Sequence, residues 1–318
     1  MSARAFRRRL VLSVSLLVLL GGLFTACQRG GQPAGAGKTP PPTPSHHRDF
    51  DHADSLAAYL RSDARPLIGA HRGGATDGFP ENAIPTSRHA LTHGPVLLEV
   101  DVRMTKDSVL VLMHDETLGR TTTGRGEIRS NSLNELRGLR LVTNAGDTTR
   151  YPVPTVAEAL AWAEGRAVLQ LDVKDDVPRS LVVDVLRRMD GLDQALVITY
   201  KLADARWYHQ RMPDLLLSVS TETRDEAVAH VEAIEPSRLV AFAGVGEPSS
   251  DVLSYLSSRN VPVTVGTFGE LDQRARQRGL VVYRDLFRQG VDIIATDDVA
   301  LASQAADTYR SENTEAVP

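Results

Sequence analysis

The chain has 318 residues, in which 36 Lys and Arg stand against 40 Asp and Glu, so its formal net charge is −4. The first 26 residues hold four Arg and no acidic residue, and without them the balance is 32 − 40, or −8. An acidic chain with 5% aromatic residues is a poor candidate for nucleic-acid binding, and a single cysteine excludes a disulfide framework.

Residues 1–26 have the pattern of a secretory signal peptide. A start rich in Arg precedes the apolar run LVLSVSLLVLLGGL, which is too short for a confident membrane span. Small residues then lead to Cys27, and a cysteine at this junction resembles the lipobox of bacterial lipoproteins, although Phe24 replaces the more usual aliphatic residue. We therefore predict a lipoprotein-type signal peptide with lipidation at Cys27. The alternative is an ordinary signal peptide or membrane anchor with an incidental cysteine.

A linker follows the predicted signal peptide. Residues 28–45, QRGGQPAGAGKTPPPTPS, are Gly, Pro and small polar residues with almost nothing to bury, a composition typical of a flexible tether. We predict a lipid-anchored linker over residues 27–48, one large domain over 49–305 and a polar tail over 306–318. The expected location is a bacterial lipoprotein that is secreted across the inner membrane and anchored to a membrane, in the periplasm or at the outer membrane.

From residue 66 onward, apolar strand-like runs alternate with helical stretches. Strands rich in Val, Ile and Leu that alternate with helices favour a parallel sheet with helices outside, and this number of repeats predicts a (β/α)8 TIM barrel. The nine candidate strands cover residues 66–71, 97–104, 109–114, 167–174, 195–200, 215–220, 239–245, 262–268 and 291–296.

Nine candidates are one too many for this barrel, and linker length identifies the extra strand. A parallel crossover needs a dozen or more residues, whereas Thr105–Ser108 is only long enough for a tight hairpin. We therefore expect residues 109–114 to fold back antiparallel on 97–104, so that His114 lies beside Glu99 and Asp101. Residues 116–150 show little regular pattern and are predicted to form a small insertion over the barrel mouth.

Three carboxylates occupy inward-facing positions of these strands. Glu99 and Asp101 are two residues apart on one strand and so point to the same side, and Asp172 lies on the next barrel strand. Acids are seldom buried unpaired, and an oxygen-only cluster suits one hard divalent cation, Ca²⁺ or Mg²⁺. The alternative for each residue alone is a surface or salt-bridged carboxylate.

Two histidines and two cations are expected at the same end of the barrel. His71 and Arg72 follow the first strand, and TIM-barrel sites gather at the carboxyl ends of the strands. Arg72 and Lys174 have the charge to bind a phosphate, while the backbone at the glycines 73 and 74 is free to bend around a ligand. His71 and His114 on either side of a phosphodiester would supply the base and the acid that its cleavage needs.

The chain resembles the glycerophosphodiester phosphodiesterase family, within the phospholipase C-like phosphodiesterase barrels. The stretches that carry the resemblance are HRGG (71–74), PEN (80–82), EVDVRMTKDSVLVLMHDETLGRTTTGRG (99–126), LDVK (171–174) and GVDIIATD (290–297). They occur in the family's order between residue 66 and about residue 300. The segment with E-x-D, H-D and R-T-T-x-G is highly specific.

The resemblance implies roles for particular residues. Glu99, Asp101 and Asp172 would bind the metal, and His71 and His114 would act as the acid–base pair. The same comparison implies that Arg72 and Lys174 bind the substrate phosphate, and that Glu81 and Asn82 support the site. The implied activity is the metal-dependent hydrolysis of glycerophosphodiesters to glycerol 3-phosphate and an alcohol.

Two departures from the family pattern affect substrate choice more than the central reaction. Asp172 stands where the family usually has Glu, and VGTFGE (265–270) lacks the usual pocket aromatic, for which Phe268 is a partial substitute. Two alternatives therefore stay open. One is a phospholipase-type or phosphoinositol phosphodiesterase on the same barrel, and the other is a non-catalytic lipid- or phosphate-binding lipoprotein.

Overall fold

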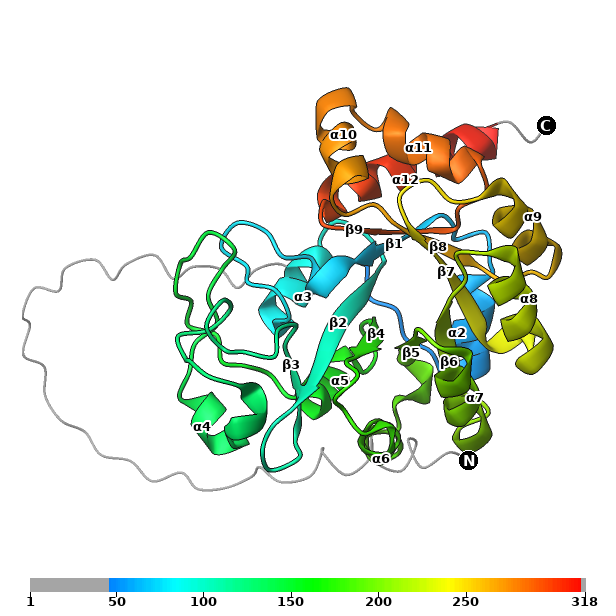
Figure 1. Cartoon of the computed structure of the whole chain (residues 1–318). Coiled ribbons are helices and arrows are strands. Elements are labelled where there is room, and N and C mark those ends of the chain that lie inside the picture. The colour runs from blue at the N-terminus through cyan, green and yellow to red at the C-terminus, as the bar shows by residue number, and fades with distance from the viewer. Residues whose placement is uncertain (1–45, 316–318) are drawn as a thin grey trace, which may run out of the picture. The chain divides into compact units, whose positions relative to one another are not determined.

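Nine strands are present in the part of the chain that the computed structural model describes, residues 46–315 (Figure 1). The predicted signal peptide, Cys27 and nearly all of the predicted linker lie outside these residues. The strands are β1 (Leu67–Ala70), β2 (Val96–Met104), β3 (Leu110–Leu112), β4 (Val168–Val173), β5 (Ala195–Thr199), β6 (Leu216–Ser220), β7 (Leu239–Val245), β8 (Val263–Gly266) and β9 (Ile293–Thr296).

Eight of these strands close into a parallel barrel. Hydrogen-bonded neighbours follow the order β1-β9-β8-β7-β6-β5-β4-β2, and β1 also pairs with β2. The remaining strand, β3, runs antiparallel to β2 outside the barrel, with Val102 opposite Leu112. The prediction of a (β/α)8 barrel with one extra hairpin strand is confirmed.

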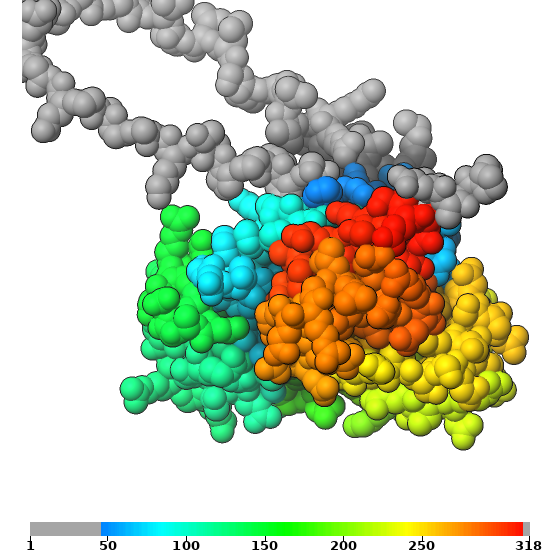
Figure 2. Space-filling model, turned by 90° about the horizontal axis from the view of Figure 1, so that it is seen from above, coloured from blue at the N-terminus to red at the C-terminus, as the bar shows by residue number. Residues whose placement is uncertain are grey.

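Helices surround the barrel, and their sequences explain where several of them begin. Three helices start with a capping box, in which a Ser or Thr and a Glu three residues later bond each other's backbone N–H: Ser132 with Glu135, Thr155 with Glu158 and Thr223 with Glu226. The helices are α2 (Ala53–Leu60), α3 (Ile84–Ala90), α4 (Leu133–Arg137), α5 (Val156–Ala163), α6 (Arg179–Met189), α7 (Leu202–Arg211), α8 (Arg224–Ala233), α9 (Ser250–Ser258), α10 (Glu270–Arg278), α11 (Val281–Arg288) and α12 (Val299–Glu315). Short 3₁₀ turns are η1 (His71–Gly73), η2 (Ile128–Ser130), η3 (Gly191–Asp193) and η4 (Pro236–Arg238). Figure 2 shows α10 and α11 (orange) lying against α12 (red) on one outer face.

Apolar side chains fill the barrel interior at the amino-terminal ends of its strands. Helix α2 covers this end, and its Leu56 and Leu60 are fully buried against the interior layer. That layer takes one residue from each of seven strands: Leu67, Leu97, Val168, Leu196, Leu216, Val240 and Ile293. Because apolar side chains fill the half of the barrel at the amino-terminal ends of the strands, we expect a ligand to bind at the opposite end, where the strands finish.

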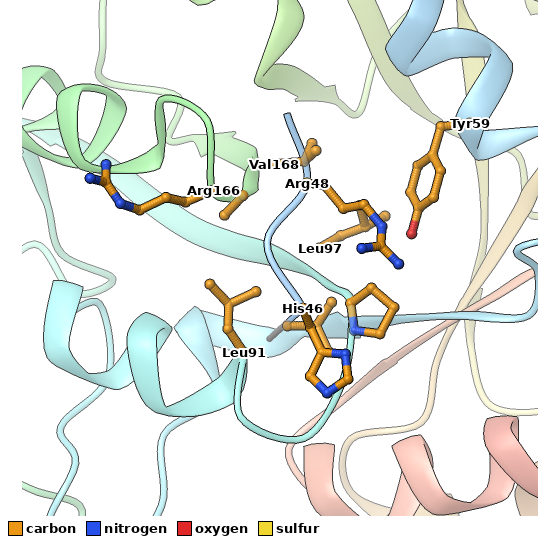
Figure 3. Close-up of a pocket in the computed structure, with 10 residues that line it drawn as sticks. His46, Arg48, Tyr59, Leu91, Leu97, Arg166 and Val168 are labelled. Carbon is orange, nitrogen blue, oxygen red and sulfur yellow. The ribbon is translucent and has the colours of Figure 1, made fainter. Parts of the chain in front are cut away.

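A pocket beside this closed end is too small for a ligand. Its lining includes Arg48, Tyr59 and the first residues of β2 and β4 (Figure 3). It holds about 10 Å³, which is room for at most one water molecule. Arg48 also donates its backbone N–H to the carbonyl of Arg166 at 3.0 Å, so the end of the predicted linker already packs on the domain.

Residues 116–150, predicted as an insertion, form a small lobe next to β3. Its buried apolar residues pack with Val153 on Val111 and Met113 of the barrel side, and they are Leu118, Ile128, Leu136 and Leu141. The lobe contains α4 and η2, which the sequence pattern did not reveal. It contacts the barrel mouth through Arg120, which bonds Glu81.

The carboxyl-terminal boundary predicted at residue 305 comes too early. Helix α12 runs to Glu315, because Ala305 and Ala306 are buried against the barrel and the Arg310 guanidinium donates to the Pro66 carbonyl at 2.5 Å. Residues 306–315 therefore continue the last barrel helix. Within residues 46–315, we find no helix with the length and apolar character that crossing a membrane requires.

Candidate active site

Three buried carboxylates meet at the carboxyl end of β2 and β4. Asp101 lies directly opposite Asp172 in the parallel register, and Glu99 is two residues earlier on the same face of β2. One oxygen from each of the three side chains lies within 4.8 Å of the others. The relative exposures of Glu99, Asp101 and Asp172 are 8%, 1% and 6%, so three negative groups share a region with little water.

Lys174 offsets part of this charge. Its Nζ lies 2.6 Å from Oδ1 of Asp101 and 2.5 Å from Oδ2 of Asp172. Burial acts to raise the pKa of Asp101, but the Lys174 ammonium and the bond from Asn82 outweigh it and hold that pKa below its ordinary value. The opposite holds for Glu99, whose pKa is raised well above its ordinary value by burial and by the neighbouring Asp101 carboxylate.

The residues present fit a divalent cation. Glu99 accepts one bond, from the backbone N–H of Arg72 at 2.6 Å, and no side-chain cation of residues 46–315 is bonded to it. Carboxylate oxygens are the ligands that Mg²⁺ and Ca²⁺ prefer, and a cation among them would relieve the repulsion that raises the Glu99 pKa. Asn82 holds Asp101, one of the candidate cation ligands, through two hydrogen bonds. Its Nδ2 donates to Oδ2 of Asp101 at 2.7 Å, and its Oδ1 accepts the Asp101 backbone N–H at 2.8 Å.

His71 follows β1 and is oriented by two contacts. Its Nδ1 lies 2.7 Å from Oδ1 of Asp297, at the end of β9, and its ring stacks on Phe268 with centroids 4.3 Å apart. A carboxylate at Nδ1 favours the tautomer with a proton there, which leaves Nε2 for a ligand. Phe268 therefore packs on a proposed catalytic ring, a contact that the sequence did not indicate.

Asp297 is itself held by a buried polar network. Its backbone N–H donates to Oδ2 of Asp272 at 2.8 Å, and the hydroxyls of Thr296 and Tyr283 donate to the same carboxylate, each at 2.9 Å. Asp272 is fully buried, so these three bonds replace its lost hydration. The turn that carries Asp297 is thereby fixed to α10 and α11.

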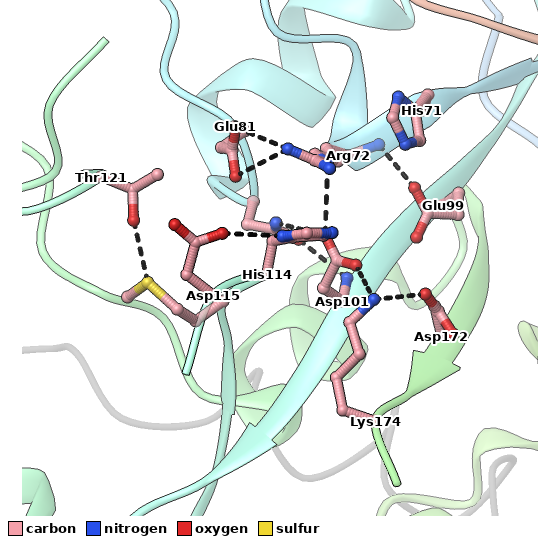
Figure 4. A network of polar contacts seen from close by, with 12 residues as sticks. His71, Arg72, Glu81, Glu99, Asp101, His114, Asp115, Thr121, Asp172 and Lys174 are labelled. Carbon is pink, nitrogen blue, oxygen red and sulfur yellow. Dashed lines mark hydrogen bonds and ion pairs between the residues drawn. The ribbon is translucent and has the colours of Figure 1, made fainter. Parts of the chain in front are cut away.

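His114 has a similar arrangement on the other side of the barrel mouth (Figure 4). Its Nδ1 lies 2.8 Å from Oδ1 of Asp115, and Arg120 donates to both oxygens of Asp115 at 2.7 and 2.9 Å. The Arg120 bonds hold the pKa of Asp115 well below its ordinary value. Arg120 also bonds both oxygens of Glu81, at 2.9 and 2.8 Å, and so connects His114 to the PEN turn.

Arg72 lies at the site, where its charge is held by two carboxylates. Its guanidinium bonds Glu81 at 3.1 Å and lies 3.8 Å from Asp101, and its backbone has a positive φ of 51°. The glycines next to it are in close packing contact with a helix. A Cβ on Gly73 would lie 3.0 Å from the Ser87 hydroxyl, and one on Gly74 would lie 3.0 Å from the Ala90 Cβ. These glycines let η1 approach α3.

The structure thus gathers all nine candidate barrel residues at one end of the barrel: His71, Arg72, Glu81, Asn82, Glu99, Asp101, His114, Asp172 and Lys174. Sequence reasoning missed Asp297, Arg120 and Tyr200. Asp297 and Arg120 fall inside the motifs TD and R-T-T, so the signal was present without an assigned role. Tyr200, whose hydroxyl donates to Asp172 at 3.0 Å, follows β5 in no recognised motif.

Asp297→Asn is expected to lower kcat roughly 10- to 100-fold with a smaller change in KM, as expected for a residue that supports a general acid or base. Asn keeps the shape and an acceptor for His71 but removes the negative charge that lies 2.7 Å from its Nδ1. Steady-state kinetics measure both constants, and thermal melting shows how much of the variant is folded.

The neighbouring carboxylate provides the control for this substitution. Asp298 accepts the Leu301 backbone N–H at 3.3 Å as a helix cap and has no contact with His71. Asp298→Asn should keep the wild-type kcat and KM. If Asp297→Asn lowers stability alone and the folded variant keeps the wild-type kcat, Asp297 does not act through His71.

The closed barrel and the polar cluster at its carboxyl end place the chain among the (β/α)8-barrel proteins with a site at the strand ends. Residues 71–301 match the model of the glycerophosphoryl diester phosphodiesterase family. The chain belongs to this family. The match spans the first histidine, all three carboxylates and the strand β9.

Individual relatives agree with this assignment. The structure of a glycerophosphoryl diester phosphodiesterase from Parabacteroides distasonis superposes with a TM-score of 0.76 at 31% identity, over 82% of this chain and 94% of that one. A glycerophosphodiester phosphodiesterase of Bacillus altitudinis is 30% identical over 48% of this chain and 66% of its own length. Glycerophosphodiester phosphodiesterase 1 of Homo sapiens is 38% identical over 29% of this chain and 28% of its own length. The chain thus matches less than two thirds of the length of these two relatives.

Proposed function

We propose that this chain hydrolyses glycerophosphodiesters to glycerol 3-phosphate and an alcohol, with one divalent cation and two histidines. The observation that carries the proposal is the carboxylate cluster, whose three oxygens lie within 4.8 Å, at the same barrel mouth as His71 and His114. A protein that only bound phosphate would need neither proton-transfer group. Membership of the glycerophosphoryl diester phosphodiesterase family supports the same activity.

The proposed cation site consists of Glu99, Asp101 and Asp172, and Ca²⁺ or Mg²⁺ suits its oxygen ligands. A bound cation supplies charge stabilisation for the phosphate oxygens or lowers the pKa of the attacking hydroxyl group. The Lys174 ammonium is paired with Asp101 and Asp172, two of the proposed cation ligands. When a divalent cation neutralises these carboxylates, the ammonium is free to bind a phosphate oxygen. Arg72 brings a second positive charge toward the same place.

The two histidines exchange protons with the substrate through Nε2, since Nδ1 of each is bonded to a carboxylate. One removes the proton of the attacking hydroxyl or water as the new P–O bond forms. The other gives a proton to the alkoxide as the P–O bond to the leaving alcohol breaks. If a second, hydrolytic step follows, the two roles exchange.

A substrate panel tests this function against the two alternatives. The purified protein is incubated with glycerophosphocholine, glycerophosphoethanolamine, glycerophosphoinositol, lysophospholipids and phosphatidylinositol in the presence of Ca²⁺ or Mg²⁺. Release of glycerol 3-phosphate from the soluble diesters supports the proposal. Turnover of the lipids alone would favour a phospholipase or phosphoinositol phosphodiesterase, and binding without any turnover would favour a non-catalytic lipoprotein.

The lipid anchor at Cys27 stays a proposal from sequence. If it is present, the wild-type protein expressed in a bacterium incorporates labelled palmitate and fractionates with membranes, because lipidation at the cysteine supplies the hydrophobic anchor. Cys27→Ser should lose the label and appear in the soluble fraction. A variant that keeps both properties would exclude lipidation at this residue.

A further inference from the structure

A second cavity lies beside the carboxylate cluster, and of the residues with a proposed role in the reaction only Lys174 lines it. Its volume is about 280 Å³, near the lower end of the roughly 300–1,000 Å³ typical of small-molecule sites. It adjoins the reaction centre through Lys174 and Tyr200, both of which bond Asp172. The polar lining residues are Arg103, Glu116, Lys174, Asp175, Asp176 and Tyr200.

The positive charges of this cavity are already paired. Arg103 bonds Asp176 at 2.9 Å and the His114 carbonyl at 2.9 Å, and Arg129 approaches the same Asp176 at 3.8 Å from outside the lining. Lys174 is shared between Asp101 and Asp172. Arg103 is therefore paired, and Lys174 is the cation proposed above to serve the phosphate, so neither is left for an anionic head group.

Negative charge remains in excess. Among the lining residues, Arg103 and Lys174 stand against Glu116, Asp175 and Asp176, which gives 2 − 3, or −1. Glu116 lies 3.7 Å from Arg103 with its side chain 77% exposed. The Asp175 carboxylate has no hydrogen bond or ion pair with any residue in the range 46–315. Both carboxylates are free to approach a positive group.

Tyr200 adds an aromatic wall. Its relative exposure is 55%, although its hydroxyl is bonded to Asp172, so the residue is anchored at one end while much of its surface stays open. Val173 is the other apolar lining residue. An aromatic face with carboxylates nearby is the environment in which ammonium groups bind, and so small an apolar surface does not suit an acyl chain.

We propose that this cavity binds the alcohol part of the substrate and selects a small cationic head group, an amine or a quaternary ammonium. The proposal rests on the function proposed above. The shared residues place the cavity next to the phosphate position, and the excess of carboxylates gives a cation an advantage that a neutral or anionic alcohol lacks. Glu116, Asp175 and Tyr200 are the specificity-determining residues.

The test compares a cationic with a neutral substrate. We measure kcat/KM of the purified full-length protein for glycerophosphocholine and for glycerophosphoglycerol, and take the ratio. In the double variant Glu116→Gln/Asp175→Asn this ratio should fall roughly fivefold, which is about 1 kcal/mol for the two exposed charge contacts together. The wild-type preference should also shrink as salt is raised.

A matched control removes two acids elsewhere. Asp184 on α6 and Glu232 on α8 are exposed, and Asp184→Asn/Glu232→Gln makes the same change in net charge. The control should keep the wild-type ratio. A ratio that is unchanged in Glu116→Gln/Asp175→Asn, or that falls equally in the control, overturns the subsite. Absence of turnover on both diesters in the wild type would instead overturn the proposed function.

Two substitutions of Tyr200 isolate the contribution of its ring. Tyr200→Phe loses the bond to Asp172 and keeps the ring, whereas Tyr200→Leu loses both. The glycerophosphocholine to glycerophosphoglycerol ratio should be roughly threefold lower in Tyr200→Leu than in Tyr200→Phe, the size expected of an exposed cation–π contact. Equal ratios in the two variants would show that the Tyr200 ring does not contribute to the selection of a cationic head group.

Discussion

Replacement of His71 or His114 by alanine is expected to lower kcat for glycerophosphocholine by about 10²- to 10⁴-fold, the range that a positioned general acid or base contributes. KM should change much less, because the proton transfers occur in the transition state and not in substrate binding. Steady-state release of glycerol 3-phosphate measures both constants. The double variant should lose little more than either single variant, since the two residues act in one reaction.

The control for these variants is a histidine away from the mouth. His209 lies on the outer helix α7, and His209→Ala should keep the wild-type kcat. Thermal melting of all three variants separates lost chemistry from lost folding. Turnover close to that of the wild type in a folded His71→Ala or His114→Ala protein would contradict the acid–base assignment.

Replacement of a carboxylate in the cluster should weaken cation binding without lowering the melting temperature of the metal-free protein. Glu99→Gln keeps an acceptor for the Arg72 N–H but removes one buried charge that faces Asp101 and has no cationic side-chain partner in the range 46–315. We expect Ca²⁺ or Mg²⁺ affinity to fall at least about 100-fold, with a comparable loss of activity. In EDTA, however, the variant should melt at the same temperature as the wild type or higher, because repulsion between carboxylates is relieved.

Calorimetric titration with each cation and melting curves in EDTA test both halves of this prediction. Glu232→Gln on α8 is the matched control, and it should bind the cation and melt as the wild type does. If Glu99→Gln lowers the melting temperature in EDTA and leaves cation affinity intact, Glu99 has a structural role and the proposed metal site is wrong.

The barrel was predictable because its signals are local and repeated. Each parallel strand is a short run rich in Val, Ile and Leu, and the short turn Thr105–Ser108 permits only an antiparallel return. The alternation along β2 likewise placed Glu99 and Asp101 on one face. The register of β2 with β4, which sets Asp101 opposite Asp172, was not predicted, because the sequence placed Asp172 only on the next strand of the barrel.

Contacts between distant segments were not predictable in this way. Asp297 reaches His71 across 226 positions, and Phe268 stacks on the same ring, because the end of the chain closes the barrel next to its beginning. The packing of the glycines 73 and 74 on Ser87 and Ala90 was not predicted either, because these two residues come from a helix whose packing no local pattern specifies. The extent of α12 was missed for the same reason, since its polar surface conceals the buried Ala305 and Ala306.

The central claim is that a divalent cation held by Glu99, Asp101 and Asp172 works with His71 and His114 on a glycerophosphodiester. The most direct measurement is the rate of glycerol 3-phosphate release from glycerophosphocholine by protein stripped with EDTA and then titrated with Ca²⁺ or Mg²⁺. We predict negligible turnover after stripping and full recovery on addition of one of the two cations. An undiminished rate in EDTA, or no glycerol 3-phosphate with either cation, would contradict the claim.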